Sequence, residues 1–101
     1  MATNKMRAIH AGEILREEFL APLGITPHAL AMSLRVPAPR INDVVREKRA
    51  ITVDTAMRLA RYFDTTAQFW MNLQSTYDLK VAEKTLSQKI ELEVQQFQKA
   101  A

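Results

Sequence analysis

The sequence predicts an all-α domain, and its composition, its glycine and proline content and its hydrophobic periodicity each support this. Of the 101 residues, 48% are hydrophobic and 25% are charged, which is ordinary usage for one small globular domain. The only glycines are Gly12 and Gly24, and all four prolines lie between Pro22 and Pro39, so the chain after Pro39 has no helix-breaking residue. Apolar side chains recur at every third or fourth position, which is the period of a helix with one buried face.

The first two helices are predicted on either side of Gly24. The first spans residues 10–23, where the apolar side chains that share one face are Ile14, Leu15, Phe19 and Leu23. Thr26 can cap the second helix through its hydroxyl, and Pro27 suits a first helical position because its missing N–H is not needed there. This second helix is predicted to run to about Leu34.

Two more helices are predicted in the middle of the chain. The third runs from Ala38 to about Arg46, and its apolar positions at helical spacing are Ile41, Val44 and Val45. The fourth begins after Thr52, whose hydroxyl can cap it. Its buried stripe consists of Ala56, Leu59, Ala60 and Phe63.

A fifth helix and an amphipathic tail complete the predicted fold. Thr65 and Gln68 have the spacing of a capping box at the start of the fifth helix, and the apolar positions that follow in steps of four are Phe69, Leu73 and Tyr77. Beyond Asp78 the chain is rich in lysine and glutamate, but four apolar side chains keep a helical spacing: Leu86, Ile90, Val94 and Phe97. This tail helix either packs against its own domain or contacts a partner or a second copy.

The positive charge is concentrated in residues 35–61. This segment holds seven basic side chains against three acidic ones, whereas the segments before and after it are neutral and slightly acidic. Such a distribution is typical of a phosphate-binding surface, and it also fits an ordinary solvated helix face. Arg58 and Arg61 are interpreted as the solvated face.

The second and third helices have the internal pattern of a helix-turn-helix. The apolar side chains that must meet between them are Leu30, Leu34, Ile41 and Val44. Ala31 provides the small residue where the helices cross, and Val36 fills the corner. The position that opens the turn is commonly glycine because its backbone is left-handed; here it is Arg35, so we expect Arg35 to adopt a positive φ.

The composition argues against several other classes of protein. The chain contains no cysteine, which excludes disulfides, thiol catalysis and cysteine-ligated zinc and favours a reducing, cytoplasmic environment. His10 and His28 have no spaced partners that would form a metal site, and no glycine-rich loop or nucleophile motif is present. We therefore expect no enzyme activity, no cofactor and no metal, and we expect no signal peptide or membrane span.

Four segments resemble the HigA-type antitoxins, within the phage-repressor-like (XRE) helix-turn-helix proteins. Two of them are residues 10–15 and residues 51–59. The most specific are Phe69-Trp70-Met71-Asn72-Leu73-Gln74 and Tyr77-Asp78-Leu79. The resemblance implies a five-helix, lambda-repressor-like domain that binds DNA as a dimer and represses its own operon. It also implies that the protein neutralises a HigB/RelE-like toxin that cleaves messenger RNA.

The resemblance places the third helix in the major groove of a palindromic operator. The side chains expected to face base edges are Ala38, Pro39, Arg40, Asn42 and Asp43. The residues expected at phosphates are Arg46, Lys48 and Arg49, together with the backbone amide of His28.

Contacts with other proteins are predicted on two further helices. Glu13 and Glu17 lie four residues apart on one face of the first helix, where they can meet a basic toxin or simply be solvated. The candidate dimer surfaces are the fifth helix and the tail stripe Leu86, Ile90, Val94 and Phe97. The aromatic run Phe69, Trp70, Leu73 and Tyr77 is interpreted as structural, and Asn72 and Gln74 either cap a neighbouring helix or cross a dimer interface.

The chain is thereby divided into three parts: a flexible N-terminal segment (residues 1–9), a helix-turn-helix DNA-binding domain (10–80) and a C-terminal helical tail (81–101). Two alternatives to the antitoxin stay open. One is a free-standing XRE-type repressor without a toxin partner, and the other is a helical adaptor that binds only protein.

Overall fold

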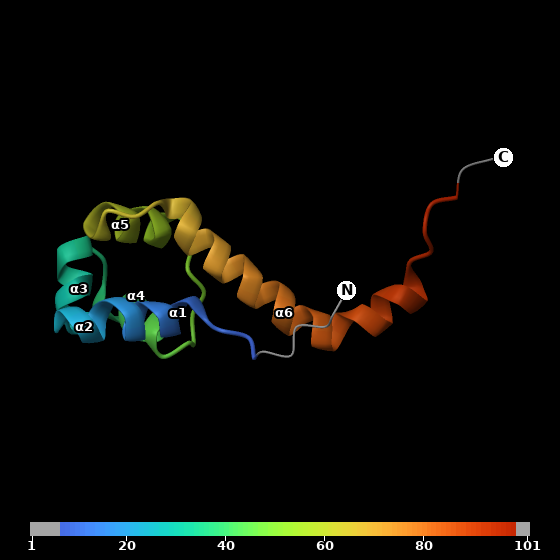
Figure 1. Ribbon diagram of the computed structural model, residues 1–101, viewed down its shortest axis with the longest axis horizontal. Helices are drawn as coiled ribbons and strands as arrows, with labels where there is room; N and C mark the ends of the chain where they lie inside the picture. Colours follow the sequence, from blue (N-terminus) through green and yellow to red (C-terminus); the bar gives the residue numbers. More distant parts are fainter. Residues whose placement is uncertain (1–6, 99–101) are drawn as a thin grey trace.

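The helices follow one another in the order that the hydrophobic pattern predicts (Figure 1). The computed structural model describes residues 7–98, and every regular element in that range is helical. In chain order the elements are α1 (Ala11–Ile14), the π-helix η1 (Leu15–Leu20), α2 (Ala21–Leu23), α3 (Pro27–Leu34), α4 (Ala38–Val45), α5 (Val53–Phe63) and α6 (Ala67–Glu93). The first three run end to end as one helix, so the described range confirms the all-α, five-helix fold.

The first helix combines a histidine cap with a widened turn. His10 Nδ1 accepts a hydrogen bond from the Gly12 N–H at 2.8 Å. Farther along, the N–H of Ala21 bonds the carbonyl of Arg16, five residues earlier, and Pro22 follows directly. Because proline lacks an N–H and crowds the preceding turn, a wider turn lets the helix pass it. Gly24 then ends the helix with φ +65°.

Threonine hydroxyls cap α3, α5 and α6, whereas α4 follows Pro37 without a side-chain cap. Thr26 and Thr52 accept hydrogen bonds from the N–H groups of Ala29 and Thr55, as the sequence predicts for α3 and α5. The predicted capping box of Thr65 and Gln68 is wrong by one residue, because Thr66 caps α6 by accepting from the Phe69 N–H at 3.0 Å. The Thr65 hydroxyl instead accepts a hydrogen bond from Trp70 Nε1 at 2.8 Å.

The core receives a large side chain from each of the five helices. The largest fully buried side chains are Leu15, Leu30, Ile41, Val44, Leu59 and Trp70. Phe19 packs its ring against Phe63 and Trp70, with ring centroids 4.9 and 5.0 Å apart. Within the aromatic run of α6, Trp70 lies in the core and Leu73 packs against it, as predicted, whereas Phe69 is exposed.

Gly12 marks a close crossing that the sequence pattern does not reveal. A Cβ atom at this position would lie 1.8 Å from the carbonyl oxygen of Val44 in α4. Only a residue without a side chain lets the backbone of α1 approach the end of α4 this closely. Gly12 thus determines how α4 lies against the first helix.

The additional C-terminal helix is a continuation of the fifth helix. α6 runs without interruption to Glu93, because neither glycine nor proline occurs in it. Val94 has an extended backbone, so Val94 and Phe97 lie beyond the helix and the predicted stripe is helical only at Leu86 and Ile90. Residues 1–6 of the predicted flexible segment and 99–101 of the predicted tail lie outside the described residues.

Candidate nucleic-acid interface

α3 and α4 form the predicted helix-turn-helix. The four side chains expected between them, Leu30, Leu34, Ile41 and Val44, are all buried. Ala31 is also buried and Val36 packs against this core, as the pattern requires. Arg35 opens the turn with φ +61°, which confirms the left-handed backbone expected at this position.

One face of α4 is turned away from the core. Pro39 is exposed, and Arg40, Asn42 and Asp43 are half-buried, so all four present atoms at the surface. Ala38 packs partly against the core and offers less surface than the sequence indicates. A face with one arginine, one amide and one carboxylate carries the donor and acceptor types that read base edges in a major groove.

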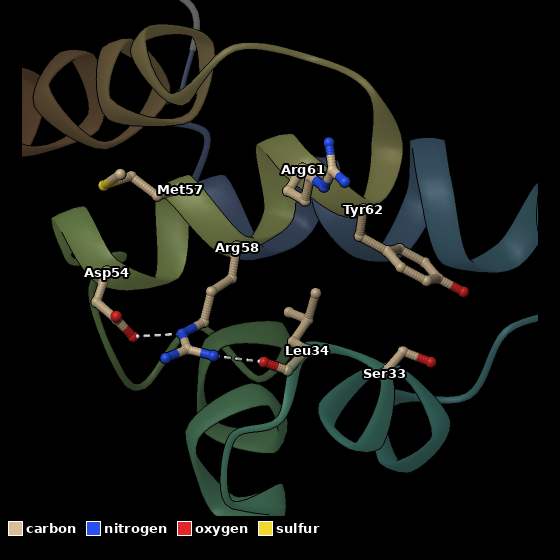
Figure 2. A pocket seen from close by; sticks show the side chains of 7 residues that line it. All are labelled: Ser33, Leu34, Asp54, Met57, Arg58, Arg61 and Tyr62. Carbon is tan, nitrogen blue, oxygen red and sulfur yellow. Dashed lines mark hydrogen bonds and ion pairs between the residues drawn. The ribbon is translucent and has the colours of Figure 1, made fainter.

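Arg40 is tied to α5 by an ion pair. Its Nη1 donates to Asp54 Oδ2 at 2.5 Å, and the Arg58 Nε donates to the same oxygen at 3.0 Å. Figure 2 shows how Arg58 also reaches the backbone carbonyl of Leu34, the last residue of α3, at 2.8 Å. Arg58 is exposed, as interpreted from the sequence, but it also links α5 to the end of α3 and satisfies a carbonyl that the helix leaves unpaired.

A basic loop follows α4. Arg46, Lys48 and Arg49 are exposed, and the turn is formed by Glu47 at φ +64° and by a 2.8 Å bond from the Lys48 N–H to the Asp43 carbonyl. Arg49 also pairs with the Asp43 carboxylate at 3.6 Å. His28 is exposed in the first turn of α3, where its own backbone N–H at the positive end of the helix favours an anion.

Comparison with known proteins identifies the family. A helix-turn-helix family model matches residues 15–70. Virulence-associated protein I of Dichelobacter nodosus is 60% identical over 81 residues, which is 80% of this chain and 75% of that protein. A Pseudomonas aeruginosa antitoxin HigA, solved with the higBA promoter, is 55% identical and has a TM-score of 0.88, covering 91% of this chain and all of that one. This chain belongs to the HigA family of helix-turn-helix antitoxins.

A second solved antitoxin structure extends the likeness to nearly the full length. The antitoxin GraA in complex with its operator is 42% identical, with a TM-score of 0.89, and the match covers 98% of this chain and all of that one. The likeness therefore includes α6 and is not limited to the helix-turn-helix.

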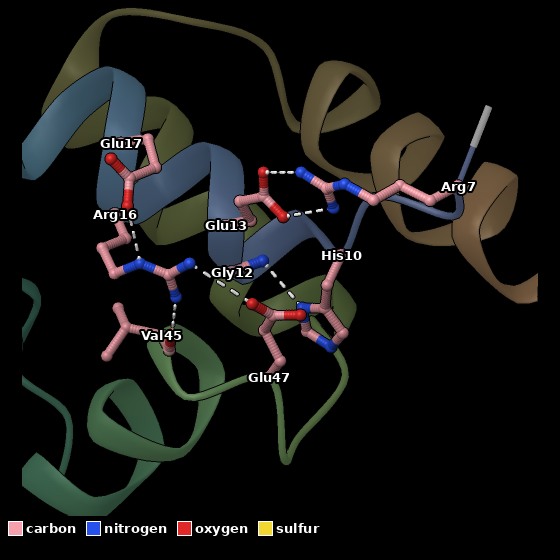
Figure 3. A network of polar contacts seen from close by, with 8 residues as sticks. All are labelled: Arg7, His10, Gly12, Glu13, Arg16, Glu17, Val45 and Glu47. Atoms are coloured by element: carbon pink, nitrogen blue, oxygen red, sulfur yellow. Dashed lines mark hydrogen bonds and ion pairs between the residues drawn. The ribbon is translucent and has the colours of Figure 1, made fainter.

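Glu13 and Glu17, the carboxylates predicted to contact a toxin, both form ion pairs within this HigA-family chain (Figure 3). Arg7 donates both of its terminal nitrogens to Glu13, at 2.6 and 2.7 Å, and Glu17 accepts from Arg16 Nε at 3.0 Å. The hydrogen bond from Arg7 holds the pKa of Glu13 below its usual value. Only 20% of the Glu13 side chain is exposed, so Glu17 is the more accessible of the two carboxylates.

Arg16 joins the first helix to the C-terminal end of α4. Its Nη1 donates to the carbonyl oxygen of Val45, and its Nη2 lies 3.3 Å from a Glu47 carboxylate oxygen. These contacts satisfy a carbonyl at the end of α4 and fix the start of the basic loop. Arg46, Lys48 and Arg49 thus lie in or directly after a turn that Arg16 and Glu47 hold in place.

The polar residues of the HigA-type aromatic run have different surroundings. Gln74 is buried, and its side-chain oxygen accepts a hydrogen bond from the Ile51 N–H at 2.7 Å. Gln74 therefore fixes the segment before α5 through an intrachain contact, the first of the two roles that the sequence leaves open. Asn72 is exposed and accepts from Gln68 at 2.8 Å.

Residues 7–98 contain neither a membrane-spanning helix nor a metal-binding cluster. None of the helices there has the length and apolar character needed to span a bilayer. In the same range, no three histidine or acidic side chains lie close enough together to hold a metal ion.

Proposed function

We propose that this chain is the antitoxin of a type II toxin-antitoxin module. It binds its own operator DNA as a homodimer, represses its operon and neutralises a HigB/RelE-like, mRNA-cleaving toxin by binding it. The observation that carries this proposal is the surface face of α4, presented by a complete helix-turn-helix and followed by an exposed basic loop. The similarity to an antitoxin HigA solved with the higBA promoter supports it.

The two parts of this surface have different tasks. Ala38, Pro39, Arg40, Asn42 and Asp43 meet base edges; Arg40 pairs with a guanine and Asp43 accepts from a cytosine amino group. The basic loop (Arg46, Lys48 and Arg49) and the amide of His28 bind phosphates, which adds affinity without sequence information. Occupation of the promoter by this complex blocks transcription in the cytoplasm.

Dimerisation brings two copies of α4 to one palindrome, with half-site centres about 34 Å apart. The exposed side chains of the tail, Leu86, Ile90, Val94 and Phe97, supply the contact between the two copies. They are apolar, and from Glu83 to Gln98 every side chain is exposed in the chain alone. Burying such a surface in a second copy is favourable because it removes apolar area from water.

The toxin is held by the acidic face of the first helix. RNA-cleaving toxins of this class are basic, so Glu17 and, after exchange of its Arg7 partner, Glu13 provide complementary charge. Replacement of both by lysine should reduce capture of the co-expressed toxin, while Glu91→Lys with Glu93→Lys on α6 should not. Equal capture by both double variants would place the toxin elsewhere.

The antitoxin acts by binding alone and has no catalytic role.

The test of DNA binding is a salt series on the protein's own upstream DNA. Wild type should bind selectively, Arg40→Ala should relax selectivity, and Lys48→Ala should weaken binding to every sequence and reduce the salt slope by about one. Lys89→Ala on the exposed part of α6 is the matched control and should change neither quantity. Wild-type protein without selective binding would overturn the proposal in favour of a protein-only adaptor.

Co-expression of the gene beside this one separates the antitoxin from a free-standing XRE-type repressor. If this chain is an antitoxin, it should copurify with the small basic protein that the neighbouring gene encodes. Expression of that neighbouring protein alone should arrest growth, and co-expression of this chain should restore it. Selective DNA binding without such a partner would support the repressor instead.

A further inference from the structure

Asp54 lies outside the predicted recognition helix but contacts a residue on it. Asp54 is in the first turn of α5, and its carboxylate receives the Nη1 of Arg40 at 2.5 Å. Arg40 is itself in the first turn of α4, the end of a recognition helix that faces base edges. The arginine best placed to read a base is therefore held by a residue of a different helix.

Asp54 is in turn fixed from the other side. Arg58, one turn later on α5, donates its Nε to the same carboxylate oxygen at 3.0 Å and its Nη1 to the carbonyl of Leu34 at 2.8 Å (Figure 2). A chain of contacts thus runs from the end of α3 through Arg58 and Asp54 to Arg40. The hydrogen bond from Arg40, followed by that from Arg58, lowers the pKa of Asp54, so the carboxylate stays ionised at neutral pH.

The contact leaves most of the guanidinium available. A guanidinium carries five N–H donors, and bidentate recognition of guanine O6 and N7 needs only one edge of it. Among the described residues Arg40 makes one side-chain hydrogen bond, through Nη1. The edge formed by Nε and Nη2 can still meet a guanine. An arginine already fixed in one orientation loses less conformational freedom when it binds.

We infer that Asp54 is a positioning residue for base recognition, which orients the Arg40 guanidinium toward one guanine of each half-site. This role rests on the proposed DNA-binding function and deepens it, because it adds a specificity-determining residue from α5. Asp54 does not touch DNA. Its effect is confined to the base that Arg40 reads.

The experiment uses operator duplexes in which each guanine of a half-site is replaced in turn by 7-deazaguanine, which lacks the N7 acceptor. For wild type, one such replacement should weaken binding by a factor of about 5 to 150, and Arg40→Ala should abolish that penalty. Asp54→Asn should reduce the same penalty at least threefold. In the Arg40→Ala background, Asp54→Asn should have no further effect on it.

Asp64→Asn is the matched control. It makes the same change of charge at the other end of α5, where Asp64 has φ +56°, a conformation that asparagine also adopts. This variant should retain the full wild-type penalty. Asp54→Ser also removes the carboxylate but keeps a short polar side chain in the first turn of α5. This variant should behave like Asp54→Asn.

Three outcomes would contradict the inference in distinguishable ways. Selective operator binding with an unreduced guanine penalty in both Asp54 variants would overturn the positioning role alone. Tighter operator binding by those variants with selectivity retained would show that Asp54 competes with DNA for Arg40, and this also overturns it. Wild-type protein without selective binding would overturn the proposed function, and the inference with it.

Discussion

The two halves of α6 are both helical, but their side chains differ in burial and in contacts. The first half carries Trp70, which is completely buried, and Gln74, whose amide fixes the segment before α5. In the second half every side chain after Ala82 is exposed, and in Figure 1 the helix extends away from the other helices. One continuous helix is thus packed into the core at one end and exposed to solvent at the other.

The two halves show that the start of a helix and its extension are stabilised by different interactions. Nucleation is costly, and in α6 the Thr66 cap and the burial of Trp70 offset that cost. Extension then adds one hydrogen bond per residue, and the glutamate, lysine, leucine and glutamine of the second half are good helix formers. The second half therefore needs no tertiary contact to be helical, and its exposed apolar side chains remain available to another molecule.

The largest expected effect comes from the buried half. Trp70→Ala should lower the free energy of unfolding by about 3–5 kcal/mol, because it removes a large side chain from the centre of the core and leaves the Thr65 hydroxyl without its donor. Leu92→Ala, on the same helix but 86% exposed, is the control and should change that free energy by less than about 0.5 kcal/mol. Urea denaturation followed by circular dichroism measures both.

Similar losses of unfolding free energy for Trp70→Ala and Leu92→Ala would contradict the division of α6 into a buried and an exposed half. They would mean that the second half is as strongly coupled to the core as the first. An effect of Trp70→Ala smaller than about 1 kcal/mol would mean that the surrounding side chains collapse into the space, as core sites sometimes do.

The fold could be predicted from the sequence where local rules suffice. Helix order follows from the period of apolar residues and from threonine caps such as Thr26 and Thr52. The left-handed backbone of Arg35 follows from the fixed geometry of the helix-turn-helix. The absence of glycine and proline after Pro39 is a signal that α6 continues to Glu93, but the tail was predicted as a separate helix.

Contacts between helices could not be predicted, because periodicity gives the face of a side chain but not its partner. Arg40 and Asp54 are 14 residues apart, and only the folded arrangement, in which α3 packs against both α4 and α5, brings them together. Gly12 shows the same limit: its lack of a side chain is required by the carbonyl of Val44, far along the chain. The site residues on α4 were predicted by motif, and their positioning by Asp54, Arg58 and Arg16 became visible only in three dimensions.

Removal of the tail should also have a small effect on stability, and it is the sharpest test of the exposed half. A chain that ends at Thr85 loses no buried side chain, so the free energy of unfolding of the monomer should change by less than about 1 kcal/mol. Analytical ultracentrifugation should nevertheless show a monomer where the full chain is a dimer. Full-length protein with Leu86→Glu and Ile90→Glu should also be monomeric, because a charge on each of these side chains cannot be buried in a second copy. A dimer that persists in both would exclude the tail as the sole contact and leave the first half of α6 as the alternative surface.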